Sequence, residues 1–494
     1  MQNLPANIYS VAAVRETDRT TIEDHGVPGY TLMIRAGEAA VREAVAAFPE
    51  ARRWQLICGA GNNGGDGYVV ARLAALEGIG VSVLTLVDPD KLTGDAATAC
   101  ADFAAEGGVI VPFEGELDGE AELLFDGILG SGLEREVGGR FAEAVAAINA
   151  HPSPVVALDI PTGIHGDSGA VLGCAVEADL TVTFVGLKSG LFLGQAPDYC
   201  GAIRFAGLDI PDSYREGIEP DFHRIDEATL NEALPRRPRT SHKGRHGHVL
   251  IVGGGEGMPG AVRLAGEAAL RTGAGLVSIA THLSHAAQIV ASRPELMPHA
   301  IEESADLDPL LDRADIIAFG PGLGQSAWAR SLFERLSEEQ RPSVWDADAL
   351  NLLAQSPNQH KERVITPHPA EAGRLLGITT DAVQADRFAA AERLAARYSG
   401  AAVLKGAGTL VFAGQKARRR WLCTSGNPGM GTAGMGDVLT GIVAALMAQG
   451  LDPALAAAVG VEVHARAGDR AARQGERGLI ASDLFAELRE VLNR

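Results

Sequence analysis

The sequence has little cysteine, no surplus of positive charge and no long apolar run. Its five cysteines are scattered along 494 residues without the paired spacing of a zinc site or a disulfide framework, which favours a reducing, cytoplasmic location. The net charge of −20 argues against nucleic acid and against an anionic membrane as partners. No apolar stretch is long enough to span a bilayer, and the first ten residues lack the basic and apolar regions of a signal peptide. These absences leave small molecules as the expected partners.

Glycine and aliphatic residues are abundant instead, with 60 Gly and 46% hydrophobic residues. This composition is typical of α/β globular proteins. The chain is longer than one ordinary core supports, so two domains are expected. After Gly207 the sequence becomes polar and proline-containing, and a basic run follows at 234–246. We therefore place the domains at residues 1–215 and 222–494.

In the N-terminal domain a strand, a glycine-rich loop, a helix and a second strand follow one another. The predicted strand is Trp54–Cys58, the loop is Gly59–Gly67 and the helix is Tyr68–Glu77. With the strand Val81–Val87 they form a βαβ unit. The loop satisfies the glycine pattern of a dinucleotide-binding turn, which supports a nucleotide ligand but does not by itself indicate hydride transfer.

Two further predicted strands of this domain end in carboxylates. Glu122–Phe125 leads into Asp126, and Pro154–Leu158 leads into Asp159. Ligands of a parallel sheet collect outside the carboxyl ends of its strands, so these acids should converge with the amides of the glycine loop. Each aspartate alone could equally well cap a turn. Their shared position beside glycine-rich loops favours a site.

Three motifs make this domain resemble the epimerase domain of the NAD(P)H-hydrate repair enzymes, a Rossmann-like doubly wound fold. They are GxGNNGGDG at Gly59–Gly67, GxGLxR at Gly130–Arg135 and DIPSG at Asp159–Gly163, in which Thr162 replaces serine. The resemblance implies that a potassium ion is held by Asn63, Asp126 and Thr162, oxygen ligands that suit a hard cation. It also implies a hydrated-nicotinamide site at Asn62, Asn63, Gly64, Gly65, Asp66, Gly130, Ser131, Gly132, Leu133, Glu134, Arg135, Glu136 and Asp159. Asp159 is the expected acid/base group.

The second domain is organised around a glycine-rich loop that leads into an apolar helix. The loop ends in Gly434-Met435-Gly436-Asp437, and the predicted helix spans Val438–Ala448. Glycine N–H groups and a helix N-terminus together suit a phosphate. A carboxylate beside such an anion hole can accept a proton from a hydroxyl that is being phosphorylated. The alternative is that Asp437 only caps the helix.

Strands and helices alternate again in this domain, which predicts a second doubly wound parallel sheet. The predicted strands are Gly247–Val252, Leu276–Ala280, Ile316–Phe319, Ser343–Trp345, Arg363–Ile365 and Ala401–Leu404. The loops Gly320–Gly324 and Lys405–Thr409 offer backbone N–H groups to phosphate, and Lys405 adds charge. Neither loop is a P-loop. His368, between two prolines, would by itself more often be structural than catalytic.

Six ordered motifs make this domain resemble the ribokinase-like dehydratase that acts on hydrated NADH or NADPH. They are HKGxxG, GPGLG, DADAL, TPHPxE, KGxGT and GxGD. The resemblance implies hydrate-binding positions at Ala261, Gly322, His368 and Asp437. It implies nucleotide-binding positions at Lys405, Gly406, Ala407, Gly408, Thr409 and Gly436. It further implies that Mg²⁺ accompanies ADP.

We therefore expect a bifunctional enzyme that epimerises the R and S forms of NAD(P)HX, the hydrated cofactors NADHX and NADPHX. It would dehydrate the S form to NAD(P)H while ADP is converted to AMP and phosphate. Asp437 is the expected base, and a homo-oligomer is expected. Two alternatives share these features: a small-alcohol or vitamin-precursor kinase, and an N-terminal domain that only binds a nucleotide or a protein. The choice between ADP and ATP, and between NADHX and NADPHX, stays open.

Overall fold

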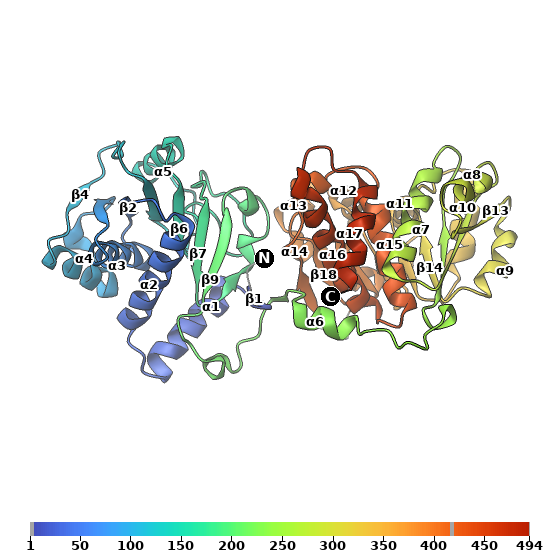
Figure 1. Cartoon of the computed structure of the whole chain (residues 1–494), viewed down its shortest axis with the longest axis horizontal. Helices are drawn as coiled ribbons and strands as arrows, with labels where there is room; N and C mark the ends of the chain where they lie inside the picture. The colour runs from blue at the N-terminus through green and yellow to red at the C-terminus, as the bar shows by residue number, and fades with distance from the viewer. Residues whose placement is uncertain (1–3, 415–418, 494) are drawn as a thin grey trace. The chain divides into compact units, whose positions relative to one another are not determined.

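The computed structural model describes residues 4–414 and 419–493, and it divides into two compact units, Met1–Phe222 and His223–Arg494 (Figure 1). Both units alternate strands and helices, as the sequence predicts. Among the described residues, no helix is long and apolar enough to cross a membrane.

Unit 1 is built on a seven-stranded sheet in the order β4-β3-β2-β5-β6-β7-β9, and every neighbouring pair is parallel. The strands are β2 (Arg53–Cys58), β3 (Gly80–Thr85), β4 (Ile110–Pro112), β5 (Leu123–Gly127), β6 (Val155–Leu158), β7 (Leu180–Phe184) and β9 (Ala202–Ala206). Two short strands, β1 (Asn7–Tyr9) and β8 (Leu187–Lys188), pair with each other. The helices are α1 (Val11–Arg19), α2 (Gly29–Ala47), α3 (Asn62–Leu76), α4 (Gly94–Ala105) and α5 (Arg140–Ala150).

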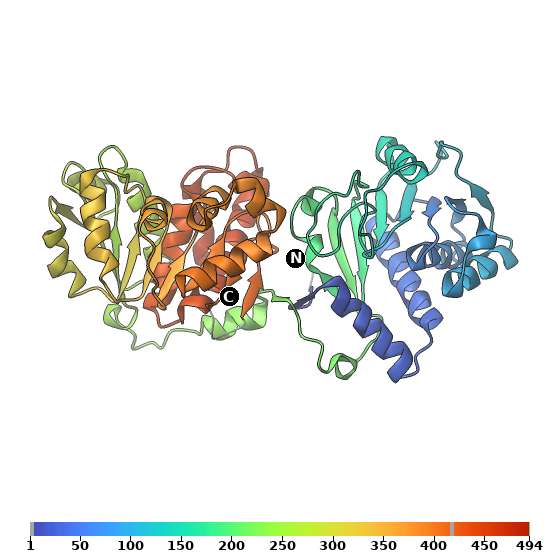
Figure 2. The ribbon, with the colours of Figure 1, turned by 180° about the vertical axis from the view of Figure 1, so that it is seen from behind.

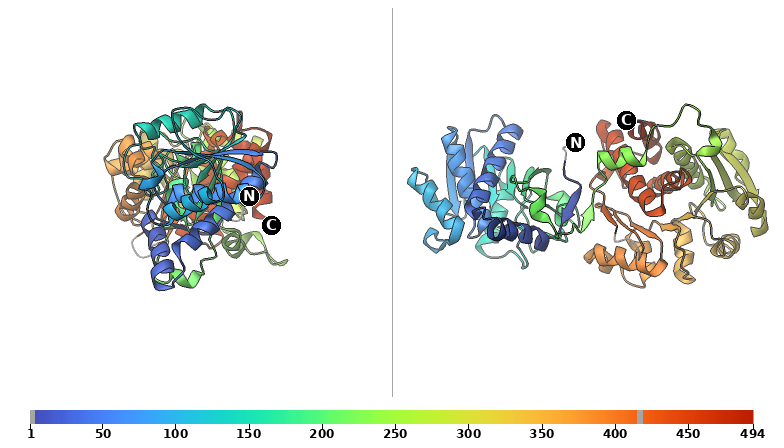
Figure 3. Two further views of the ribbon diagram at one scale, coloured as in Figure 1. Left: turned by 90° about the vertical axis from the view of Figure 1, so that its left-hand side faces the viewer. Right: turned by 90° about the horizontal axis from the view of Figure 1, so that it is seen from below.

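Helices cover both faces of this sheet. Leu56 of β2 packs in a cluster with α2, α3 and α4, whereas its neighbour Ile57 packs in a second cluster with α5. Figure 3 (right) shows the blue helices α2 to α4 gathered together. A strand that is buried on both faces needs apolar residues in succession, which explains the continuous run of β2.

Helix α3 begins earlier than predicted. The sequence predicts a loop up to Gly67, but the helix starts at Asn62. The glycines serve close packing there: a Cβ on Gly65 would lie 2.6 Å from Met33 Cε, and one on Gly67 would lie 2.7 Å from Cys58 Sγ. Glycine weakens a helix interior by about 1 kcal/mol relative to alanine, and here it allows α3 to lie directly against α2 and β2.

Unit 2 contains a sheet in the order β13-β12-β11-β14-β15-β16-β17-β18-β19. Its strands are β11 (His248–Val252), β12 (Leu276–His282), β13 (Met297–Ile301), β14 (Ile316–Phe319), β15 (Ser343–Trp345), β16 (Arg363–Ile365), β17 (Ala401–Leu404), β18 (Leu410–Phe412) and β19 (Arg420–Leu422). The short strand β10 (Phe222–His223) lies at the boundary between the units. Pairing is parallel from β13 to β17, which confirms the predicted sheet. The prediction missed the parallel strand β13 and the antiparallel strands β18 and β19.

Helices surround this sheet, and Figure 2 shows the yellow and orange ones in front of it. Their bounds are α6 (Glu227–Ala233), α7 (Pro259–Thr272), α8 (Ala286–Ser292), α9 (Asp308–Leu311), α10 (Ala327–Ser337), α11 (Ala347–Gln355), α12 (Pro369–Leu376), α13 (Thr380–Ala385), α14 (Arg387–Tyr398), α15 (Met435–Ala448), α16 (Pro453–Ala471) and α17 (Leu484–Leu492).

The buried helix α15 positions the site of unit 2. It is apolar on nearly all sides, as expected of a helix inside a large core. It packs closely on α7, because a Cβ on Gly441 would lie 2.0 Å from the carbonyl oxygen of Ala265. Its N-terminus starts at Met435 rather than the predicted Val438, so Asp437 lies inside the first helical turn.

Candidate active sites

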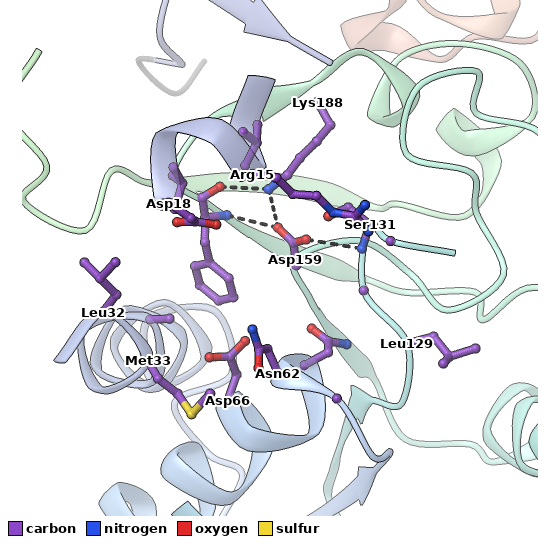
Figure 4. A pocket seen from close by; sticks show the side chains of 18 of the residues that line it. Arg15, Asp18, Leu32, Met33, Asn62, Asp66, Leu129, Ser131, Asp159 and Lys188 are labelled. Carbon is purple, nitrogen blue, oxygen red and sulfur yellow. Dashed lines mark hydrogen bonds and ion pairs between the residues drawn. The ribbon is translucent and has the colours of Figure 1, made fainter. Parts of the chain in front are cut away.

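The predicted loops of unit 1 converge on one cavity of about 880 Å³ at the carboxyl ends of its strands (Figure 4). The predicted residues that line it are Asn62, Asn63, Asp66, Gly130, Ser131, Gly132, Leu133, Glu134, Arg135 and Asp159. Three predicted positions do not line it. Gly64 and Gly65 are buried within α3, and Glu136 is exposed outside the cavity. Most of the predicted positions therefore lie on one cavity, whereas the two glycines of α3 serve packing.

Asp159 follows β6 with a backbone φ of 66°, a strained conformation for a residue with a side chain. Its Oδ1 forms an ion pair with Lys188, whose side chain is only 1% exposed. Lys188 Nζ also donates to Thr183 Oγ1 (3.1 Å) and to the Phe184 carbonyl (2.7 Å), so its three donors are all used inside the protein. Lys188 therefore orients Asp159 and has no donor left for a ligand.

The pKa of Asp159 is lowered despite its burial. Burial opposes ionisation, but the Lys188 ammonium and hydrogen bonds from Ser131 and Phe184 outweigh it. Asp159 is thus held in its ionised form at neutral pH, the form that a proton acceptor must have.

Two other aspartates of the same cavity behave in the opposite way. The pKa of Asp18, on α1, is raised to about 6 by burial and by the charge of Asp159. The pKa of Asp66, on α3, is raised well above its usual value by burial and by the charges of Asp159 and Asp18. Neither carboxyl makes a hydrogen bond or ion pair with any residue that the structure describes. The pKa values of the carboxyl groups in this cavity are therefore shifted in opposite directions.

The three predicted cation ligands lie together behind the loop Ile128–Gly130. Asp126 is fully buried and accepts hydrogen bonds from Thr162 N (2.7 Å), Thr162 Oγ1 (2.7 Å) and Ile128 N (3.2 Å). Burial raises the pKa of Asp126 to about 6, although these hydrogen bonds oppose the shift. Asn63 is 7% exposed, and neither atom of its amide has a partner among the described residues. An unpaired buried amide oxygen beside a carboxylate fits a hard cation.

In unit 2, Asp437 lies at the N-terminus of α15, and the helix cap is a different residue. Gly434 holds the N-cap position with φ 89°, and no side chain caps the helix. Asp437 makes no hydrogen bond with a described residue. Burial and the charge of Asp346 raise its pKa to about 7, against the opposing charge of Lys405. A carboxyl that titrates near neutral pH is suited to act as a base.

A buried ion pair lies beside Asp437. Asp346, 2% exposed, accepts a hydrogen bond from Lys405 Nζ (2.8 Å) and another from Thr440 Oγ1 (2.9 Å). Burial opposes the ionisation of Asp346, but Lys405 and Thr440 hold its pKa below the usual value. A Cβ on Gly436 would lie 3.2 Å from Lys405 Nζ. Lys405 therefore points toward the N-terminus of α15.

His368 caps α12. Its Nδ1 accepts from the backbone N–H groups of Ala370 (3.1 Å) and Glu371 (3.4 Å), while Glu371 Oε2 accepts from His368 N (2.9 Å). Burial and the charge of Lys405 lower the pKa of His368, and burial raises that of Glu371 to about 7. Because Nδ1 accepts hydrogen bonds from two backbone N–H groups, it carries no proton, and the 3.4 Å approach of His368 Nε2 to Glu371 Oε1 is a contact of a neutral imidazole.

The loop after Lys405 is fixed from behind by a buried arginine. Arg387 donates to the carbonyl oxygens of Leu404, Lys405 and Gly408, each at 3.3 Å. Thr409 closes the turn by donating to the Gly406 carbonyl at 2.8 Å. The carbonyl groups of the loop are thus directed inward to Arg387.

Ala261 and Gly322 also lie together, although they are 61 residues apart in sequence. A Cβ on Gly322 would lie 2.9 Å from Ala261 Cβ, and Gly322 has φ 56°. Gly320, in the same loop, contacts the carbonyl of Asp346, because a Cβ there would lie 1.9 Å from that oxygen. All four predicted hydrate-binding positions therefore belong to loops and helix ends at one edge of the sheet. The described residues contain no group of three His, Cys, Asp or Glu side chains able to hold a metal ion.

Comparisons with known proteins agree with both halves of this architecture. Residues 249–490 match the family described as NAD(P)H-hydrate dehydratase, and residues 29–190 match the family described as YjeF-related protein N-terminus. A ribokinase-like superfamily protein of known structure from Enterococcus faecalis is 29% identical, covers 55% of this chain and 95% of its own, and gives a TM-score of 0.51. Unit 2 thus has a ribokinase-like fold.

Relatives that contain both halves are more similar still. The bifunctional NAD(P)H-hydrate repair enzyme of Coxiella burnetii is 46% identical over 487 residues, which cover 98% of this chain and 99% of that protein. Its counterpart in Escherichia coli is 43% identical over 493 residues, covering 99% and 95%. The chain belongs to the family of bifunctional NAD(P)H-hydrate repair enzymes.

Four site residues escaped the sequence analysis: Asp18, Lys188, Asp346 and Glu371. The last two stand in motifs that were recognised, DADAL and TPHPxE. Asp346 directly follows β15 and Glu371 lies in the first turn of α12, and acidic side chains at such positions were a usable signal. Asp18 lies in an ordinary helix and Lys188 in the apolar run Phe184–Leu193, so neither carried a signal of its own.

Proposed function

We propose that this chain repairs hydrated nicotinamide cofactors in two steps. Unit 1 interconverts the R and S epimers of NADHX and NADPHX, and unit 2 dehydrates the S epimer while ADP becomes AMP and phosphate. The observation that carries the proposal is that relatives matching along the whole length share both halves. Each half of this chain also places a carboxyl group among the groups that the reaction needs. The dehydratase site is Asp437 beside an α-helix N-terminus, and the epimerase site is the Asp159–Lys188 pair.

In unit 2, Asp437 is the proposed base. Water is a poor leaving group at neutral pH, whereas phosphate is a good one, which explains why a nucleotide is consumed. Asp437 would take the proton of the substrate hydroxyl as that oxygen attacks the terminal phosphoryl group. The N–H groups of Gly434–Gly436 at the start of α15 would hold the transferred group. Ala261, Gly322 and His368 are the proposed contacts of the hydrated ring.

The nucleotide is proposed to bind at Lys405, Gly406, Ala407, Gly408, Thr409 and Gly436. Arg387 supports this role, because its bonds to three carbonyls fix the loop from behind. The N–H groups of Lys405 and Gly406 donate to the Pro367 carbonyl and to Thr409 Oγ1, whereas those of Ala407 and Gly408 have no partner among the described residues and can reach phosphate oxygens. Lys405 would supply charge from its pair with Asp346. Mg²⁺ is proposed to arrive with the nucleotide and to neutralise phosphate charge, since this ion is commonly held by one or two carboxylates plus substrate phosphates.

In unit 1, potassium is the proposed ion between Asn63, Asp126 and Thr162. The unpaired amide of Asn63 supports a ligand there. Thr162 carries the hydroxyl that serine supplies in the family motif, and it already bonds Asp126. The ion would hold the ends of β5 and β6 in register with α3, and so shape the cavity in which Asp159 acts on the substrate.

The test uses purified R and S epimers of NADPHX. With ADP and Mg²⁺, the S epimer should yield NADPH and one inorganic phosphate per turnover, and the R epimer should do so after epimerisation. Asp159→Asn should still dehydrate the pure S epimer but stall on a mixture with the R epimer left over. A stable phosphorylated product without free phosphate would instead support the small-molecule kinase. No epimerisation by the intact chain would leave unit 1 as a binding module.

We also infer a cytoplasmic location and a homo-oligomer, with residues 1–215 and 222–494 as the functional domains. The scattered cysteines and acidic composition support the location. Light scattering on the intact chain measures the oligomeric state, and a single-chain mass near 51.4 kDa would refute the oligomer.

A further inference from the structure

The epimerase cavity contains an aspartate that its neighbours leave unpaired. Asp66 lies on the cavity wall beside Leu32 and Met33, and Figure 4 shows its carboxyl group on the same cavity as that of Asp159. Asp159 has an ammonium and several hydrogen-bond donors, whereas Asp66 has no partner among the described residues. Two carboxyl groups in one cavity are thus held in opposite chemical environments.

The charges around Asp66 favour its neutral form. The other charged residues that line the cavity come from several elements: Arg15 and Asp18 of α1, Asp95 of α4, Glu134 and Arg135 of the loop after β5, Asp159 after β6, and Lys188 of β8. Lys188 is the cation that acts on Asp66, and its donors are used by Asp159 and two neighbours. An unpaired carboxylate in a cavity that it shares with other carboxylates is costly, so burial and the charges of Asp159 and Asp18 favour the protonated form of Asp66. A neutral carboxyl group can donate that proton.

We propose that Asp66 is the acid of the epimerase site and works as a pair with the Asp159 carboxylate, a proposal that rests on the epimerase function of unit 1. The substrate carbon bears a hydroxyl group next to the ring nitrogen. Opening the ring at that carbon needs one group to take the hydroxyl proton and another to give a proton to the nitrogen. The cavity supplies both, and a pair of carboxyls with separated protonation is the usual arrangement for such chemistry.

The step balances without any further reactant. Asp159 takes the hydroxyl proton, the O–H electron pair forms the second C–O bond of an aldehyde, and the C–N bond breaks with its electron pair moving to nitrogen. That nitrogen receives the proton of Asp66. Rotation about the adjacent C–C bond presents the other face of the aldehyde, and the nitrogen closes on it. Asp66 regains its proton and Asp159 returns its own, so each turnover restores the enzyme for either epimer.

The test compares Asp66→Asn in the intact chain with wild type and with Asp88→Asn. Asparagine keeps the size of Asp66 but has no proton to transfer, so epimerisation should fall about 10²–10⁴-fold. Dehydration of the pure S epimer should be unchanged, because unit 2 performs it. Asp88 caps the short turn Pro89–Lys91 outside the cavity, and asparagine caps equally well, so its variant should epimerise like wild type. Near-normal epimerisation by Asp66→Asn overturns the proposal.

Two measurements on the wild-type chain test the same idea without a variant. Ring opening keeps the substrate oxygen, so epimerisation in ¹⁸O-labelled water should leave the hydroxyl unlabelled, and label entering in step with epimerisation overturns the mechanism. If Asp66 must be protonated to act, the epimerisation rate of wild type should decline as the pH rises through the pKa of Asp66. The residual epimerisation rate of Asp66→Asn should not show that decline. If wild type does not epimerise at all, the function proposed for unit 1 fails, and this inference with it.

Discussion

Replacing Asp437 with asparagine tests the dehydratase site most directly. A general base contributes about 10²–10⁴-fold, which corresponds to about 2.7–5.4 kcal/mol of transition-state stabilisation at 1.36 kcal/mol per decade. Asparagine has nearly the same shape but cannot accept the proton. Dehydration of pure S-NADPHX should therefore fall by a factor in that range, while epimerisation in unit 1 should be unchanged.

The structure also predicts that this variant stays folded. Gly434 caps α15, so Asp437→Asn removes no cap, and no described side chain loses a hydrogen bond. Loss of a negative charge at a helix N-terminus typically costs about 0.3–1 kcal/mol. Removing this acid also removes its repulsion with the carboxylate of Asp346, which stabilises the folded protein and offsets part of that cost. The melting temperature should thus change by no more than about 4 °C.

The assay follows NADPH formation at saturating ADP, with a melting curve and an epimerisation rate on the same preparation. Near-full dehydratase activity would refute Asp437 as the base. A fall in melting temperature together with loss of both activities would show a structural effect and would also refute the reasoning. Only the selective loss of dehydration supports the catalytic role.

Three further predictions concern pH, potassium and the nucleotide loop. The pKa of Asp437 is raised to about 7, so this base is protonated below that pH and the dehydration rate should fall on acidification below about pH 7. The rate is measured in buffers of constant ionic strength. A flat pH profile down to pH 5 would contradict the prediction. Epimerisation should need potassium, and Asp126→Asn should weaken that dependence while dehydration persists; equal rates in sodium or lithium alone would remove the cation from the site. Arg387→Met should raise the KM for ADP more than it lowers kcat, because the loop of Gly406 and Thr409 loses its support; an unchanged KM would place the nucleotide elsewhere. Lys405→Met should likewise raise the KM for ADP and spare epimerisation.

Much of the scaffold was readable from the sequence, because its signals are local. Four strands of unit 2, from Ile316–Phe319 to Ala401–Leu404, have the predicted bounds. Apolar runs that end in glycine-rich loops mark buried parallel strands, and such strands place their loops at a common edge. For that reason Asp159 and Asp437 could be assigned to sites before any distance was known.

Other features depend on contacts that sequence proximity does not report. The start of α3 at Asn62 was missed, because glycine usually signals a loop, and only packing against Met33 and Cys58 shows why this helix tolerates it. The antiparallel strands β18 and β19 were missed as well, because their pairing with β17 and with each other is a tertiary contact that no local pattern marks.

The electrostatic environment of each acid was decided by tertiary structure alone. Asp66 and Asp159 are the same residue type and line the same cavity, yet their pKa values shift in opposite directions. The difference arises because Lys188, 29 residues from Asp159 in sequence, is folded against that carboxylate and not against Asp66. Electrostatic energy depends on distance and burial, so the sequence by itself determined which acids are present, and only the fold determined the direction in which the pKa of each one shifts.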